Sequence, residues 1–322
     1  MKLPKINEKI VKQIGRFAPL ITLVVVFVAS IFIGYPHFLQ GQNMVNILRQ
    51  ISYTGIIALG TTFVIVAGGI DLSVGAMTAM VGGIVIVVLN LFGEASMLGV
   101  GVAMLAGVAA GGLAGAFNGL IVTKGRIAPI IVTLGTMSIF RSLVIYAGSA
   151  GEFRSVNSLF PTVGAGSVLG LPVPIIVFVL LAVLLHLLFN NTAFGRFVCA
   201  IGANERVALY SAVNINRVKM ITYIIGGVTV GITSVLWASR LNSVNSSNMG
   251  LFYELDAITA VVIGGTAMSG GFGSIWRTVL GCLTLGIINN MLNMVGVSSY
   301  LQGAVKGAVI IGAVLLQYRR PK

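Results

Sequence analysis

Long apolar runs, separated by short polar stretches, recur along the whole chain and limit its fold more than any other feature. A helix needs about 20 mostly apolar residues to cross a bilayer. Charged residues make up 8% of the 322 residues, against about 25% in a soluble globular protein. Too few polar residues remain to cover the surface of a soluble domain of this size. The sequence therefore predicts an all-α polytopic membrane protein, and it excludes a soluble enzyme, a disordered protein and a secreted disulfide scaffold.

Ten apolar segments are candidates for spanning helices. We expect helix 1 at 17–35, and we interpret it as a retained helix rather than a signal peptide because no small-residue cleavage site follows it. The other segments lie at roughly 50–69, 72–92, 97–123, 127–147, 171–190, 219–239, 256–270, 276–295 and 300–317. The segment at 256–270 is short for a full span, which indicates a broken or tilted helix.

The basic residues of the chain fall mostly at one set of helix ends. With ten spans, only Arg49, Arg154 and Arg240 lie on the predicted outer side. The predicted inner side holds Lys2, Lys5, Lys9, Lys12, Arg16, Lys124, Arg126, Arg196, Arg206, Arg217, Lys219, Arg277, Arg319, Arg320 and Lys322. Loops that stay in the cytoplasm carry such an excess of Lys and Arg. This bias predicts cytoplasmic N- and C-termini, and it explains the net charge of +13 by membrane orientation rather than by nucleic-acid binding.

The chain is predicted to form one transmembrane domain over 1–322 that contains two inverted halves. The first four-helix half covers 50–147 and the second covers 219–317. Five helices separate the starts of the two halves, and an odd number forces opposite orientations in the membrane. A linking helix at 171–190 and a cytoplasmic loop at 191–218 join the halves. Inverted repeats of this kind commonly place a substrate route at their interface.

Motifs for several kinds of chemistry are absent from the sequence. No G-x-x-x-x-G-K-[ST] loop and no G-x-S-x-G elbow occurs, so the chain is not expected to hydrolyse ATP or to act as an enzyme. His37 and His186 belong to no metal-spaced motif, and Cys199 and Cys282 cannot build a disulfide framework. We expect neither a cofactor nor a metal site in this chain.

Small residues repeat at intervals of four in the segment 97–123. Gly107, Gly111, Gly115 and Gly119 lie on one slowly drifting face of a helix, because residues four apart are neighbours on its surface. Without a hydrophobic drive in lipid, such a ridge lets two helix backbones approach closely. We therefore predict a helix-packing surface there, which says nothing about a substrate.

Acidic residues stand at the starts of two corresponding helices. Asp71 lies in the stretch GGIDLSVG at 68–75, and Asp256 follows Glu254 where the segment 256–270 opens. Either Asp71 or Ser73 could simply cap a helix, and acidic residues suit a first helical turn. The alternative is a gate, because carboxylates at broken helices in membranes mark solute pathways. The inverted halves would place Asp71 near the inner mouth, and Glu254 with Asp256 near the outer mouth.

Further polar side chains are predicted inside spanning helices. The group consists of Asn118, Arg141, Asn289 and Asn290, together with Asn293 and Lys306. Burial of such groups in lipid costs free energy, so they are expected to face protein or water. The first four either line a translocation path with Asp71 and Ser73 or only join helices. Few carboxylates lie inside the membrane, which weighs against ion coupling.

The motifs together resemble one family of membrane proteins. Residues 60–65 followed by GGIDLSVG at 68–75 resemble the signature of permease subunits of bacterial sugar ABC importers of the ribose, xylose and galactoside type. The stretch 254–265, the glycines through Gly273, the amides Asn289, Asn290 and Asn293, the stretch 202–205 and the pair Val305-Lys306 agree with it. Family members usually carry small residues after Gly-Gly-Asn-Glu and then Ser-Gly, whereas here Arg206, Val207 and Ala212 occupy those positions.

The resemblance implies a multi-pass subunit of the bacterial cytoplasmic (inner) membrane. It would pair with a second permease copy or a paralog, a cytoplasmic ATPase would drive it, and an extracytoplasmic solute-binding protein would deliver the solute. Coupling to the ATPase is expected from Gly202, Asn204, Glu205, Arg206 and Ser211. The function expected is import of a small polar solute, a pentose or related sugar. The alternatives are a stand-alone secondary carrier or facilitator, an ABC permease for a nucleoside or branched-chain amino acid, or a non-transporting scaffold.

Overall fold

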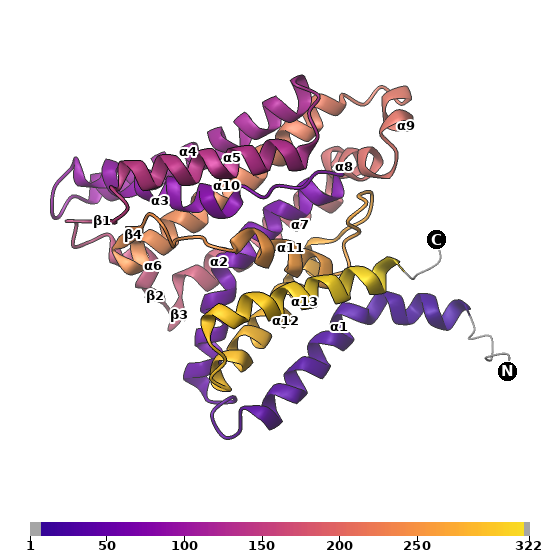
Figure 1. Ribbon diagram of the computed structural model, residues 1–322, viewed down its shortest axis with the longest axis horizontal. Helices are drawn as coiled ribbons and strands as arrows, with labels where there is room; N and C mark the ends of the chain where they lie inside the picture. The colour runs from indigo at the N-terminus through magenta and orange to yellow at the C-terminus, as the bar shows by residue number, and fades with distance from the viewer. Residues whose placement is uncertain (1–7, 319–322) are drawn as a thin grey trace.

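The computed structural model describes residues 8–318 as a mostly helical chain (Figure 1). Lys2, Lys5, Arg319, Arg320 and Lys322, which the charge argument used, lie outside the described residues. The helices are α1 Glu8–Ile33, α2 Gly41–Val66, α3 Val74–Asn90, α4 Met97–Lys124, α5 Pro129–Ala147, α6 Pro161–Ala165, α7 Val173–Asn191, α8 Ala193–Ala203, α9 Glu205–Tyr210, α10 Ile215–Leu241, α11 Tyr253–Ile263, α12 Ile275–Met294 and α13 Ser299–Tyr318. Four short strands accompany them, β1 Glu152–Arg154, β2 Ser167–Val168, β3 Leu171–Pro172 and β4 Ser243–Asn245.

Six helices in the described part of the chain are long and apolar enough to cross a membrane. They are α2, α4, α5, α7, α10 and α12. The apolar part of α1, from Phe17 to Ile33, and the helix α3 are slightly shorter than the length required of a span. The prediction of a helical protein with several apolar spans is confirmed, whereas the full count of ten spans stays a prediction.

Several helix boundaries differ from those expected. Helix α2 begins at Gly41 rather than near 50. Hydropathy did not predict this start, because the first turns of the helix are polar. The expected loop at 191–218 holds two helices, α8 and α9, and α10 begins inside it. Helix α11 covers Tyr253–Ile263 rather than 256–270, and irregular backbone with Gly265 at a φ of 83° follows it.

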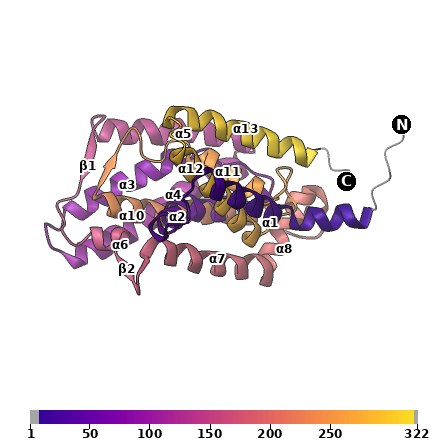
Figure 2. The ribbon, with the colours of Figure 1, turned by 90° about the horizontal axis from the view of Figure 1, so that it is seen from below.

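Two opposite ends of the molecule carry different structures (Figures 1 and 2). One end holds α6 and the four strands, where β1 pairs with β4 in antiparallel register and Phe153 lies opposite Val244. The other end holds α8 and α9, and the N-terminal end of α1 and the C-terminal end of α13 lie toward it. The loops that follow α5 and α10 therefore meet at one end, and the loop that follows α7 lies at the other.

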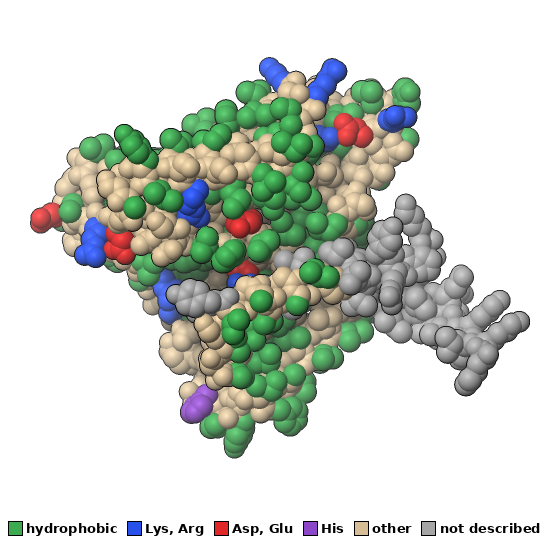
Figure 3. Space-filling model, in the orientation of Figure 1, with side chains coloured by type: hydrophobic (Ala, Val, Ile, Leu, Met, Phe, Trp, Pro, Cys, Tyr) green, Lys and Arg blue, Asp and Glu red, His purple; other side chains and the backbone are tan. Residues whose placement is uncertain are grey.

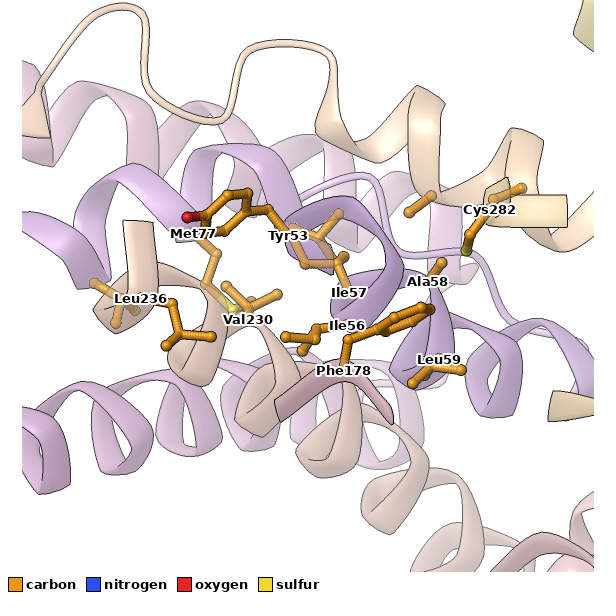
Figure 4. Close-up of a cluster of buried hydrophobic side chains, with 14 of the residues drawn as sticks. Tyr53, Ile56, Ile57, Ala58, Leu59, Met77, Phe178, Val230, Leu236 and Cys282 are labelled. Atoms are coloured by element: carbon orange, nitrogen blue, oxygen red, sulfur yellow. The ribbon is translucent and has the colours of Figure 1, made fainter. Parts of the chain in front are cut away.

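Apolar side chains both fill the interior and cover the surface. Figure 3 shows hydrophobic side chains over much of the visible face, as expected where lipid rather than water is the surrounding medium. The interior centres on α2 and α3, and most residues of α3 are buried. In Figure 4, Ile56 and Ile57 of α2 lie near Phe178 of α7 and Val230 of α10.

The small residues of α4 meet the small residues of α10. Gly107, Gly111, Gly115 and Gly119 are all buried against α10 or its neighbours. A Cβ added at Gly111 would lie 2.8 Å from the Cα of Gly231 in α10. The absence of side chains on both helices is what permits this close approach of the two backbones.

Candidate functional site

A short loop between α2 and α3 places a carboxylate inside the helix bundle. Asp71 in this loop is 1% exposed. Its Oδ1 accepts hydrogen bonds from the backbone N–H of Ser73 at 2.9 Å and from the Ser73 hydroxyl at 2.6 Å. The Ser73 hydroxyl accepts another from the side-chain amide of Asn118 in α4, at 2.8 Å. Asp71, Ser73 and Asn118 therefore form one connected polar group, which we call the inner polar group.

The inner polar group keeps unpaired polar atoms. In the described part of the chain, Oδ2 of Asp71, Oδ1 of Asn118 and the hydroxyl of Tyr223 in α10 are buried without a hydrogen-bond partner. Burial of unpaired polar atoms costs free energy, and membrane proteins accept that cost mainly where function requires it. A cleft lined by Gly68, Gly69 and Tyr223 has a volume of about 10 Å³, roughly that of one water. This cleft is too small to hold a sugar.

The inner polar group lies near the end of the molecule that carries α8 and α9. Helix α2 ends at Val66, shortly before Asp71, and the carbonyl of Val66 accepts a hydrogen bond from Gly271 at 2.9 Å. Gly202 of α8 packs directly against the same carbonyl and against Gly271. The glycine-rich loop after α11, the end of α2 and α8 therefore meet at one point, next to Asp71.

A second set of charges lies toward the end that carries β1 and β4. Arg141 of α5 donates from Nη1 to the carbonyls of Ser246, Ser247 and Met249 at 3.1, 3.2 and 3.0 Å. Glu254, in the first turn of α11, is 7% exposed and acts electrostatically on Arg141. Arg141 thus holds the segment between β4 and α11 against α5.

An ion pair joins α11 to α13 beside this arginine. The ammonium of Lys306 lies 2.8 Å from Oδ1 and 2.9 Å from Oδ2 of Asp256. The Asp256 side chain is 6% exposed and the Lys306 side chain is 16% exposed. Figure 3 shows acidic and basic side chains together on the face between α5 and α13. We call Arg141, Glu254, Asp256 and Lys306 the outer charged group.

Aromatic side chains stack beside the outer charged group. Trp237 of α10 stacks on Tyr253 of α11, with ring centroids 4.6 Å apart, and lies 5.6 Å from the ring of Tyr53 in α2. The guanidinium of Arg240 lies 5.9 Å from the centroid of the Tyr53 ring. The sequence reasoning missed this stack, although Trp237 is one of only two tryptophans in the chain.

The amides of α12 take different positions. Asn290 exchanges hydrogen bonds with Asn43 of α2, at 2.8 and 3.2 Å, and so joins α12 to α2. Asn289 is 8% exposed, and its Oδ1 has no partner among the described residues. Neither amide lies in the inner polar group or in the outer charged group, so the structure does not bring all the predicted pathway residues together.

The segment 191–218 folds into two short helices. Asn204 caps α9 by accepting a hydrogen bond from the backbone of Val207 at 3.1 Å. Glu205 does not cap the helix; it forms an ion pair at 2.7 Å with Lys219 of α10, while Arg206 is exposed. Ser211 donates from its hydroxyl to the carbonyl of Val207 at 3.1 Å.

Ala212 has a left-handed backbone conformation. Its φ is 58°, a region where a Cβ costs about 1–2 kcal/mol and where glycine is free of that cost. This explains why glycine suits the position and why the alanine noted in the sequence is a strained departure.

Most of the predicted pathway, docking and coupling residues thus lie in three separate places: the inner polar group, the outer charged group and the α8–α9 segment. Asn289 and Asn290 lie on α12, outside all three. The sequence reasoning did not assign the partners of two further residues. Lys306 was the lone lysine within its helix, yet its partner Asp256 lies fifty residues away. Tyr223 lies one turn from Lys219, but nothing local indicated that it reaches the Asp71 loop.

Comparisons with known proteins identify relatives along nearly the whole chain. The family described as "Branched-chain amino acid transport system / permease component" matches residues 43–314. The ribose import permease protein of Bacillus subtilis (strain 168) is 42% identical, and the match covers 97% of this chain and 95% of the relative. The D-allose and L-arabinose transport system permease proteins of Escherichia coli (strain K12) are 37% and 34% identical over 94% and 95% of this chain, and 90% and 92% of their own lengths. No solved structure matches the chain.

Proposed function

This chain belongs to the permease-component family that matches residues 43–314, and from that premise we propose that it imports a pentose or related sugar at the expense of ATP. It is the membrane permease subunit of a sugar importer and not an enzyme. The observation that carries the proposal is that relatives matched over at least nine-tenths of both chains are named as permeases for ribose, allose and arabinose.

Uptake into proteoliposomes tests the proposed substrate and energy source. The chain is reconstituted with the ATPase and the solute-binding protein that we propose as its partners. Labelled ribose, arabinose and allose are offered with a nucleoside and leucine as competitors. We expect uptake of a pentose that requires ATP and the binding protein. Uptake driven by a proton or sodium gradient alone would instead identify a secondary carrier, and competition by leucine or the nucleoside alone would reassign the substrate.

We place the chain in the bacterial cytoplasmic membrane with ten spans and cytoplasmic termini. The helices α1, α2, α3, α4, α5, α7, α10, α11, α12 and α13 correspond in order to the ten apolar segments. The described ends of α1 and α13 lie toward α8 and α9, in agreement with the distribution of basic residues. Reporter fusions after Gly170 and after Tyr210 test this topology: alkaline phosphatase is expected to be active at the first position and inactive at the second.

The two inverted halves have support in the packing of the helices. Helix α3 packs on α4, α5 and α10, and the corresponding helix α11 packs on α12, α13 and α2. Helix α4 packs on α10 as α12 packs on α2. These are the pairs expected from a two-fold axis that exchanges α2 with α10. An experimental structure whose halves do not superpose after inversion would contradict this proposal.

We propose that the solute path runs between two permease copies along the face formed by α5 and α13. Both helices lie on one face of the molecule, with the outer charged group between them (Figures 2 and 3). Lys306 keeps 16% exposure on this face, and an ionised group at the centre of a helix costs about 2.5–3.5 kcal/mol in lipid, so a second copy is expected to cover it. On α13, Gly303 and Gly307 have no neighbouring atoms where a Cβ would point, which leaves room for close helix contact.

Cysteine chemistry tests this face. In a chain without Cys199 and Cys282, Ser142→Cys on the exposed side of α5 is expected to cross-link between copies, and Leu180→Cys on α7 is the lipid-facing control. Burial raises the pKa of the Cys199 thiol, so the native cysteine reacts slowly but still has to be removed. Cross-linking from Leu180→Cys and not from Ser142→Cys would move the interface to another face.

We propose that α8 and α9 couple the permease to its ATPase. The support is their position at the end with the basic residues, and the contact of Gly202 with Val66 and Gly271. A displacement of α8 would move the end of α2, which Gly202 contacts, and with it the loop that contains Asp71. The inner polar group is accordingly our candidate for the inner gate.

We also propose that Glu254 and Asp256 serve the outer mouth, where the binding protein docks. Both carboxylates are buried, at 7% and 4% exposure, so they cannot form the docking surface themselves in this conformation. Their role is indirect: Arg141 holds the segment 246–249 at the outer end, and the charge of Glu254 favours the charged form of that arginine.

A further inference from the structure

A groove opens between α1 and the start of α12, outside the inner polar group and the outer charged group. Its volume is about 470 Å³. Its walls include Phe17 and Leu20 of α1, Phe272 of the preceding loop, and Trp276, Arg277 and Leu280 of α12. Ligand sites commonly have volumes of about 300–1,000 Å³ and combine mostly apolar walls with a few polar groups.

The apolar walls of the groove are open to the surroundings. Phe17, Leu20, Phe272 and Trp276 are 54%, 44%, 53% and 45% exposed. Each belongs to or adjoins a helix of the membrane domain, so the medium that reaches them is lipid or the membrane interface. Tryptophan is enriched at that interface, because its ring is apolar and its N–H is polar. The walls therefore suit an acyl chain and its glycerol end.

Arg277 is the one cationic side chain among the described residues that line the groove. The guanidinium of Arg277 lies 5.2 Å from the centroid of the Phe272 ring. Among the residues that the structure describes, three ion pairs form, and none includes Arg277. Guanidinium groups match phosphate geometry and bind it through parallel hydrogen bonds. The groove thus offers charge complementarity to a phosphodiester.

The height of Arg277 in the membrane suits a headgroup. Arg277 is the third residue of α12, whose 20 residues span about 30 Å, close to the thickness of the hydrocarbon core. The helix dipole at the N-terminus of α12 also favours an anion. The side chain of Ser274 does not cap this end of the helix. The sequence before Phe17 also carries Lys2, Lys5, Lys9, Lys12 and Arg16, and such basic segments attract anionic leaflets.

We propose that this groove binds one anionic phospholipid of the inner leaflet. Arg277 binds the phosphate, and the acyl chains lie along Phe17, Leu20, Trp276 and Leu280. A net negative headgroup such as phosphatidylglycerol is preferred over a zwitterionic one, because the described residues that line the groove include neither Glu nor Asp to receive a headgroup amine. The bound lipid would fix α1 against α12, next to the glycine-rich loop that contacts α8.

Trp276 makes the proposal directly measurable. The full chain with Trp237→Phe keeps Trp276 as its sole tryptophan and is placed in phosphatidylcholine nanodiscs. Brominated phosphatidylglycerol or brominated phosphatidylcholine, with identical acyl chains, is then added at equal mole fraction. We expect the phosphatidylglycerol to quench Trp276 at least twofold more, and we expect inorganic phosphate not to relieve the quenching.

Variants separate the groove from general surface charge. Arg277→Gln is expected to bring the two quenching levels together, Arg277→Lys to keep part of the preference, and Arg217→Gln, an inner-side control outside the groove, to keep all of it. Elution as a single species in size-exclusion chromatography checks that each variant folds. Equal quenching in the parent chain, or a preference that survives Arg277→Gln, would overturn the proposal. This readout needs neither the ATPase nor transport, so it fails or succeeds independently of the proposed function.

Discussion

Breaking the ion pair between Asp256 and Lys306 is expected to destabilise the chain strongly. The ammonium lies 2.8 Å from the nearer carboxylate oxygen, which gives an attraction of about 6 kcal/mol at an effective dielectric constant of about 20. Most of this attraction offsets the cost of removing both charges from water. Asp256→Asn removes the attraction and leaves the Lys306 charge buried, which costs about 3–5 kcal/mol for such pairs. Because the Lys306 side chain keeps 16% exposure, we expect the lower end, about 3 kcal/mol.

Equilibrium unfolding of the detergent-solubilised chain measures this effect. Trp237, which stacks on Tyr253 one turn from Asp256, reports unfolding by its fluorescence as sodium dodecyl sulfate is added. The double variant Asp256→Asn with Lys306→Met is expected to lose only about 1 kcal/mol, since no unpaired charge remains. Glu152→Gln is the matched control: it breaks the exposed pair with Arg154, for which a loss of less than about 1 kcal/mol is expected.

The double-mutant cycle decides whether this reasoning holds. We expect the losses in unfolding free energy of the two single variants to sum to at least about 2 kcal/mol more than the loss of the double variant. The reason is that substitutions of two residues in contact do not have additive effects on stability. If the losses simply add, or if Asp256→Asn unfolds like the parent chain, the pair does not stabilise the fold as argued.

Three other substitutions have expected outcomes. Glu205→Lys is expected to abolish substrate-stimulated ATPase activity in the assembled complex without loss of folded protein, and the swap with Lys219→Glu restores the ion pair; full activity of the single variant would contradict the coupling role. Gly111→Leu is expected to cost more than about 3 kcal/mol in detergent unfolding, since the side chain meets the backbone of α10, whereas Gly101→Leu, which meets open space, is tolerated. Ala212→Gly is expected to raise stability by about 0.5–1 kcal/mol, because it relieves the positive φ but enlarges the unfolded ensemble; a loss of stability would show that the conformation is not strained.

The membrane environment, the apolar helices and the helix-packing surface of α4 could be predicted from the sequence alone. Hydropathy over about 20 residues is a property of a single segment, so the apolar spans needed no knowledge of their neighbours. The ridge that contains Gly111 followed from the helical repeat. The segment expected at 256–270 was recognised as too short for a full span, but the helix itself occupies Tyr253–Ile263. The polar start of α2 could not be read in this way, because it carries no hydropathy signal.

Contacts between distant segments were decided only by the tertiary structure. Nothing local could assign Asn118 to Ser73, Lys306 to Asp256, or Trp237 to the rings of two other helices. In a soluble protein the apolar stripe of a helix shows which side faces the core, but helices in lipid are apolar all round. Their rotation and register are then set by the fit of small residues and by the need of each buried charge for a partner, and both depend on the whole bundle at once.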